Sequence, residues 1–223
     1  MTGKPDDCTY ERTLTVLSVV GSLVSLRDNY YVTCTMEAHP GGETRYTALD
    51  LAKPGEAAYK QDEMNFDIAN PGKAVRLTDL FSEADIFNAM LADPFVKKQV
   101  ENFRRDHPEK PPPPKTLDEL THSLWPDLDK GECYSVADDM FTRFAFHHIE
   151  NGKVAVRLGL SGAGPCREKL TELGILLPIP QSLKSALALA DSGKEGFLMK
   201  DLKKVSRGQT TKLVFKTGKG AQH

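Results

Sequence analysis

The chain has 223 residues with 29 basic and 31 acidic side chains, so its formal net charge is −2, and 39% of its residues are hydrophobic. A chain of this length and composition can bury a core, which excludes wholesale disorder. A net charge near zero argues against a dedicated nucleic-acid-binding protein, and no run approaches the roughly 18 apolar residues of a membrane-spanning helix. We therefore expect a folded chain with no nucleic-acid partner and no transmembrane segment.

The N-terminal third predicts an antiparallel meander. Residues 13–20, 23–26 and 30–36 are rich in β-branched and aromatic side chains, and turn-forming residues separate them. Residues 39–42, with one proline and two glycines, predict a loop, and residues 45–50 predict the strand that follows it. A further short strand is predicted at 64–68.

Helix start signals follow in the middle of the chain. Ser82 is followed three residues later by Asp85, which matches a capping box, and apolar residues then recur at helical spacing. Asp93 and Pro94 predict the start of a second helix, and the prolines at 108 and 111–114 end it. The polyproline run predicts a rigid surface linker. Thr116 predicts the cap of a further helix.

The clearest hairpin is centred on Asn151 and Gly152, the preferred type I′ turn pair, between strands at 140–149 and 154–160. The residues that follow predict, in order, a helical turn at 168–173, a strand at 175–178, a helix at 183–190 and a strand pair at 196–199 and 212–216. Because strands flank a central helical block, the sequence predicts an α+β fold, with a mainly antiparallel sheet packed against a few helices.

Positive charge is concentrated towards the C-terminus. Residues 193–223 include eight basic and two acidic side chains, a charge of +6, which leaves −8 for residues 1–192. We expect residues 1–192 to form the α+β domain and residues 193–223 to form a basic appendix or tail that is solvated or docks on the acidic body. Binding of this segment to an anionic polymer or a membrane surface is the alternative.

The four cysteines, Cys8, Cys34, Cys133 and Cys166, allow three disulfide pairings. None belongs to a CxxC pair or lies at zinc-finger spacing from a histidine, so a zinc ribbon is not expected. Sequence order favours the pairs Cys8–Cys34 and Cys133–Cys166, with free, buried thiols as the alternative. The compartment decides between them, because disulfides persist only in an oxidising environment.

No catalytic motif is present: the chain has no G-x-S-x-G, no P-loop and no G-x-G-x-x-G. His147 and His148 are the obvious metal candidates, but neighbouring side chains on a strand point to opposite faces. We therefore expect one half-buried and one exposed histidine, no metal site, no cofactor and no catalytic residue. The alternative is an enzyme, a hydrolase that uses His147 or His148, Cys166 or the acidic loop described below.

Three stretches in order resemble one bacterial family. They are residues 19–26 with Tyr30, Tyr31 and the Ala38-His39-Pro40 motif; residues 72–81, which read Gly-Lys-x-x-x-Leu-x-Asp-Leu-Phe; and residues 144–160, followed by 164–165 and 177–180. This order is similar to the RsiV-like extracytoplasmic domain, which also occurs beside PdaC-type peptidoglycan deacetylase domains. The resemblance covers residues 16–190. The chain departs from the family pattern at Met36 and Glu37, where family members usually have two glycines.

The resemblance implies a non-enzymatic binding domain of the cell envelope, periplasmic or secreted, that contacts a protein such as lysozyme or peptidoglycan. Residues 1–7 are polar and do not read as an export signal. Loops carry variable recognition, so the candidate surfaces are the Pro-rich linker, residues 37–43 and an acidic segment, residues 127–139. The acidic segment suits a basic partner best. The sequence does not predict the oligomeric state. The candidate ligand-binding residues are Glu37, His39, Asp127, Asp129, Asp138 and Asp139.

Overall fold

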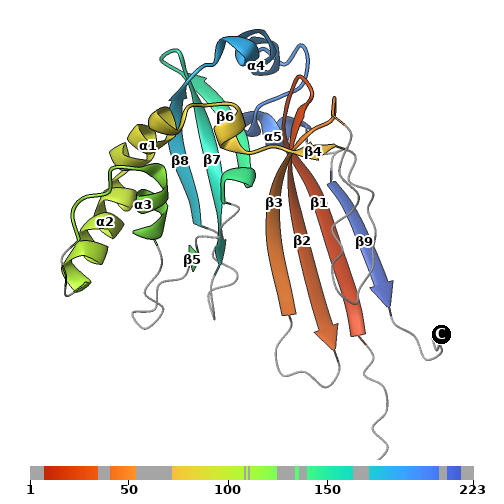
Figure 1. The fold of residues 1–223 in the computed structure, drawn as a ribbon. Helices are drawn as coiled ribbons and strands as arrows, with labels where there is room; N and C mark the ends of the chain where they lie inside the picture. The colour runs from red at the N-terminus through yellow and green to blue at the C-terminus, as the bar shows by residue number, and fades with distance from the viewer. Residues whose placement is uncertain are drawn as a thin grey trace, which may run out of the picture.

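The computed structural model describes residues 8–34, 41–53, 72–107, 109, 111–124, 134–135, 140–162, 171–205 and 210–216. In these residues the chain forms two antiparallel sheets and a group of short helices (Figure 1). This is the α+β class that the sequence predicts.

The first sheet contains the predicted meander, in the order β4-β3-β2-β1-β9. β3 already begins at Gly41, which lies opposite Val32, so the predicted loop is wrong for Gly41 and Gly42. Glycine keeps its backbone N–H, and pairing with a neighbouring strand overrides its low strand propensity. The strand predicted at 64–68 lies outside the described residues. The strands are β1 (Cys8–Val20), β2 (Leu23–Cys34), β3 (Gly41–Asp50), β4 (Lys73–Ala74) and β9 (Thr210–Lys216).

The second sheet is built on the predicted hairpin. Asn151 and Gly152 have φ values of 49° and 73°, as a type I′ turn requires, so this prediction is confirmed. Residues 140–142 form a 3-10 turn, where the sequence predicts the start of a strand. Residues 171–173, predicted as a helical turn, are a strand because they pair with β7. The strands are β5 (Tyr134–Ser135), β6 (Phe144–Glu150), β7 (Lys153–Gly162) and β8 (Thr171–Pro178), with β7 pairing with each of the others.

The predicted helix starts are confirmed by their caps. Ser82 accepts from the backbone N–H of Asp85, Asp93 from those of Phe95 and Val96, and Thr116 from that of Glu119. The three helices that follow are short because prolines and loops interrupt them. The helices are α1 (Glu83–Ala92), α2 (Pro94–Asp106), α3 (Leu117–His122), α4 (Lys184–Asp191) and α5 (Leu202–Val205), with 3-10 turns η1 (Leu77–Asp79), η3 (Met140–Thr142), η5 (Gln181–Leu183) and η6 (Met199–Asp201).

One hydrophobic core joins the helices to both sheets. Helices α1, α2 and α3 lie on one side of the second sheet (Figure 1), and their buried side chains pack with Phe144, Phe146 and Leu158. Val20 and Leu23, at the β1–β2 turn of the first sheet, belong to the same core. Leu77 and Phe81, from the segment 72–81, are 0% and 5% exposed, and Leu80 between them is partly buried against the same core.

The two sheets also meet on the other face of the second sheet. There Gly159 lies against the ring of Tyr46, so close that a Cβ atom on the glycine would be 2.6 Å from Tyr46 Cδ2. Each sheet has a β-bulge near this junction, in β1 between Val16 and Ser18 and in β6 between Phe146 and His148. The Ser18 hydroxyl accepts a hydrogen bond of 3.2 Å from the buried Phe146 N–H, which satisfies the edge of β6.

The described part of the basic C-terminal segment is built into this fold. Phe197 and Leu198 are buried, and Val19 and Phe197 exchange two backbone hydrogen bonds of 2.9 and 3.0 Å. β9 confirms the strand predicted at 212–216, and it pairs along β1 from Thr15 opposite Thr210 to Thr9 opposite Lys216. The predicted pairing with residues 196–199 is wrong, because Phe197 forms a single bridge to Val19 and a 3-10 turn begins at Met199. The first sheet thus extends across the predicted boundary after residue 192.

Candidate functional site

The candidate ligand-binding residues that the sequence nominates lie outside the described residues, and so do Cys133 and Cys166. Described residues adjoin the two candidate segments, and they belong to paired strands. The segment with Glu37 and His39 leaves β2 at Cys34 and returns at Gly41, and β5 separates the two halves of the acidic segment, where Tyr134 pairs with Gly162 of β7. The other four candidates, Asp127, Asp129, Asp138 and Asp139, belong to the acidic segment.

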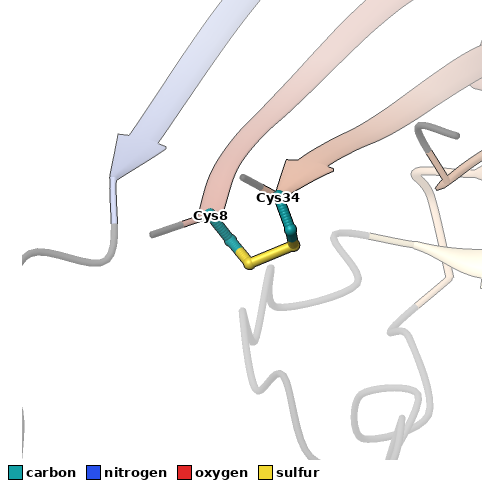
Figure 2. The surroundings of a disulfide bond; sticks show 2 residues. All are labelled: Cys8 and Cys34. Atoms are coloured by element: carbon teal, nitrogen blue, oxygen red, sulfur yellow. A yellow bond between two sulfur atoms is a disulfide. The ribbon is translucent and has the colours of Figure 1, made fainter. Parts of the chain in front are cut away.

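The end of the first hairpin is closed by a disulfide. Cys8 and Cys34 lie directly opposite each other in the β1–β2 register, with Cα atoms 4.1 Å apart, and their sulfur atoms are bonded (Figure 2). This is one of the two pairs that sequence order favours, and it is confirmed. Its position ties the end of β2, from which the segment of Glu37 and His39 starts, to the neighbouring strand.

One face of the first sheet is polar along much of its length. The register places Arg27 between Thr15 and Tyr46, and Asn29 and Tyr31 follow on the same face. Tyr31 is 42% exposed. Arg27 Nε and Asn29 Oδ1 are buried without a hydrogen-bond partner, and they are the two such side-chain atoms among the described residues. Because buried polar atoms are normally paired, this face has hydrogen-bonding capacity that the fold does not use.

A cavity of about 320 Å³ lies at the other end of the first sheet, with Asp50 and Lys53 in its wall. The Asp50 carboxylate is already engaged: Ser22 Oγ donates to it at 2.6 Å, the Ala52 N–H at 3.1 Å, and Lys53 Nζ lies 3.3 Å away. The pKa of Asp50 is lowered, and the hydrogen bond from Ser22 is the main cause, while burial acts in the opposite direction. Ser22 lies in the turn between β1 and β2, and Ala52 and Lys53 follow β3, so Asp50 joins these two turns and has a structural role.

His147 and His148 do not lie as the sequence predicts. Val156 and Ala155 are consecutive in β7 and face Phe146 and His148, so His147 is the additional residue of a β-bulge. The bulge turns both imidazoles to the same side of the sheet. Their Nδ1 atoms are 2.8 Å apart, and both side chains are half-buried. The expectation of one half-buried and one exposed histidine is therefore wrong, because it assumed an unbroken strand.

Glu150 continues this line of side chains. Its Oε2 atom lies 3.2 Å from His148 Nε2. In the ranges that the structure describes, no group of three or more His, Cys, Asp or Glu side chains is placed to hold a metal ion. No helix in those ranges is long and apolar enough to cross a membrane.

No protein-family model, curated protein or solved structure matches this chain. The site is therefore defined by its own geometry: a sheet end closed by the Cys8–Cys34 disulfide, and a polar face of the same sheet. The resemblance to the RsiV-like family remains a prediction from the residues quoted above.

Proposed function

We propose that this chain is a non-enzymatic binding domain of the cell envelope, of the RsiV-like kind, and that its partner is a basic protein such as lysozyme. The observation that carries the proposal is the Cys8–Cys34 disulfide. Disulfides form and persist outside the reducing cytoplasm, so this bond supports a periplasmic or secreted location.

The position of the disulfide supports a binding role as well. It fixes Cys34 three residues before Glu37, and the pairing of Gly41 with Val32 fixes the other end of the same segment. A short segment anchored at both ends on a rigid sheet loses less conformational entropy on binding than a free loop would. Recognition residues on such segments are common in proteins whose scaffold is rigid.

The acidic segment provides the charge for a basic partner. It includes Asp127, Asp129, Asp138 and Asp139, and residues 1–192 have a net charge of −8. Opposite charge accelerates the encounter of two proteins and fixes their orientation. Peptidoglycan, the other partner that the resemblance implies, would depend less on these carboxylates.

The test is biolayer interferometry of the whole chain against lysozyme and against soluble peptidoglycan fragments, at low and at moderate salt. Lysozyme should bind, and its association rate should fall as salt screens the charges. Changing the four aspartates to asparagine should weaken binding. A control variant with the same change in charge, Glu83→Gln, Glu101→Gln, Glu109→Gln and Asp118→Asn on the exposed helix side, should not.

Each other result has a definite meaning. Undiminished binding of the four-aspartate variant removes the acidic segment from the proposal. Binding of peptidoglycan fragments alone replaces the protein partner by a glycan one. Absence of binding to both at low salt overturns the proposal, and cleavage of the fragments supports the hydrolase alternative.

A further inference from the structure

The paired histidines of β6 have an arrangement that the proposed function does not use. A hydrogen bond between two Nδ1 atoms holds one proton, because one ring must donate and the other must accept through its lone pair. The 2.8 Å separation of His147 Nδ1 and His148 Nδ1 thus brings two metal-binding nitrogens together around a single proton. Both Nδ1 atoms have a lone pair when His147 and His148 are each in the neutral tautomer with the proton on Nε2.

Glu150 sets the state of His148. A carboxylate only accepts hydrogen bonds, so His148 Nε2 donates to Glu150 Oε2 at 3.2 Å. Neutral His148 therefore has its proton on Nε2 and its lone pair on Nδ1, the atom that faces His147. Histidines that bind metal ions commonly donate their other ring N–H to a carboxylate in this way, which fixes the tautomer and orients the ring.

We propose that His147 and His148 bind one Cu(II) ion through their Nδ1 atoms, with water completing the coordination. At a metal–nitrogen distance of about 2.0 Å, two neighbouring ligands of a square-planar ion are about 2.8 Å apart, and two ligands of a tetrahedral ion about 3.3 Å. The observed 2.8 Å is a hydrogen-bond distance, and it shows that the two nitrogens already lie within the spacing that a single ion requires. Cu(II) also binds nitrogen ligands more tightly than the other divalent ions of its row.

The surroundings permit such a site. The two imidazole planes are at 81° to each other and 4.9 Å apart at their centres. To bind one ion, the rings must turn from each other towards a common point, a change in χ2, which is a torsion with a broad energy minimum. The side chains of His148 and Glu150 are 32% and 51% exposed, so an ion and its water ligands reach the pair from solvent. The β-bulge supplies the arrangement, since in a regular strand the two rings would lie on opposite faces.

The test uses the untagged whole chain in a weakly coordinating buffer, titrated with Cu(II) and followed by calorimetry and electron paramagnetic resonance. We expect one tight Cu(II) per chain, with hyperfine structure from two imidazole nitrogens and weaker binding of Zn(II). The variant His148→Asn should bind Cu(II) about 10- to 100-fold more weakly, and Glu150→Gln about 10-fold, the usual effect of a lost outer carboxylate. The control His107→Asn, on an exposed histidine of the helix side, should bind like the unchanged chain.

Three results would overturn the proposal: an unchanged affinity in the double variant His147→Asn/His148→Asn, a resonance spectrum without two imidazole nitrogens, or tighter binding of Zn(II) than of Cu(II). Circular dichroism establishes that each variant is folded. The spectrum of the unchanged chain decides the question even if a variant does not fold.

Discussion

Gly152 and Gly196 both have a left-handed backbone, with φ values of 73° and 77°, but their surroundings differ. At Gly152, in the β6–β7 turn, no heavy atom beyond the two chain neighbours lies within 4 Å of the place where a Cβ would be. At Gly196 the carbonyl oxygen of Val19 lies 2.2 Å from that place, because the backbones of Val19 and Phe197 are hydrogen-bonded. A side chain at Gly152 would therefore meet backbone strain alone, whereas a side chain at Gly196 would meet both backbone strain and a steric clash.

We therefore predict that Gly152→Ala lowers the free energy of unfolding by about 1 kcal/mol, the cost of left-handed backbone alone. Gly196→Ala should lower it by about 3 kcal/mol, because the added methyl must also displace the backbone of β1. Urea denaturation of both variants measures the difference. Equal losses would show that Gly196 does not approach β1 as closely as described.

Asp50 makes stability depend on pH. Its pKa is lowered from the ordinary value of 3.8, chiefly by the Ser22 hydroxyl, so folding favours the ionised carboxylate. The resulting stabilisation is present above about pH 4 and is lost as the pH falls through the lower pKa of the folded state. Ser22→Ala should therefore cost about 1–2 kcal/mol at pH 7 and progressively less towards pH 2.5.

Denaturation of the unchanged chain and of this variant over that pH range measures the effect. Ser192→Ala is the matched control, because the Ser192 hydroxyl donates to the uncharged carbonyl of Leu189. Its cost should not change with pH. A cost of Ser22→Ala that is the same at pH 7 and pH 2.5 would contradict the role given to Asp50.

Among the elements, the β1–β2 hairpin is stabilised in two ways. Its strands are paired from the Gly21–Ser22 turn to the Cys8–Cys34 disulfide, and the bond closes a loop with a sequence separation of 26. A crosslink of this length restricts the unfolded chain and stabilises a protein by roughly 3 kcal/mol. The disulfide thus acts mainly on the unfolded state.

The double variant Cys8→Ser/Cys34→Ser should lose about 3 kcal/mol of unfolding free energy without reductant. The neighbouring pair Thr9→Ser/Thr33→Ser, which lies opposite in the same hairpin, should lose much less. Alkylation of the unfolded chain without reductant, followed by mass spectrometry, should leave Cys8 and Cys34 unmodified. Alkylation of both would show that the bond is absent.

The elements that the sequence predicts well are those with local signals. Ser82, Asp93 and Thr116 cap helices through their own side chains, and Asn151 and Gly152 form a turn by their own backbone preferences. The bulge at His147 has no such signal, because it results from the fit of β6 to β7. The arrangement of the histidine pair was therefore missed, and so was its contact with Glu150, which needs the same bulge. The nominated acidic residues lie outside the described residues, and their role remains a prediction.

At the scale of the whole molecule, the first sheet joins distant parts of the chain. β1 has β2 on one side and β9 on the other, so β9 covers an edge that would otherwise present unpaired backbone groups. Exposed strand edges promote association between molecules. This pairing could not be predicted from sequence, because no local pattern states which distant strand lies beside β1.

A chain that ends at Val205 should therefore self-associate and unfold at a lower denaturant concentration than the full chain. Analytical ultracentrifugation and urea denaturation measure the two effects. Lys212→Gln/Lys216→Gln is the control, since it removes two charges but keeps the strand. If the shortened chain sediments and unfolds like the full one, β9 does not protect the edge of β1.

The same pairing sets an order of events during biosynthesis. Roughly 200 residues separate the partners Thr9 and Lys216. At about 5–20 residues per second, a ribosome needs on the order of 10–40 s to synthesise this intervening stretch. The β1–β2 hairpin lacks its β9 neighbour throughout this interval. A newly made chain therefore passes through a vulnerable period, in which a chaperone that shields β1 would be of most use.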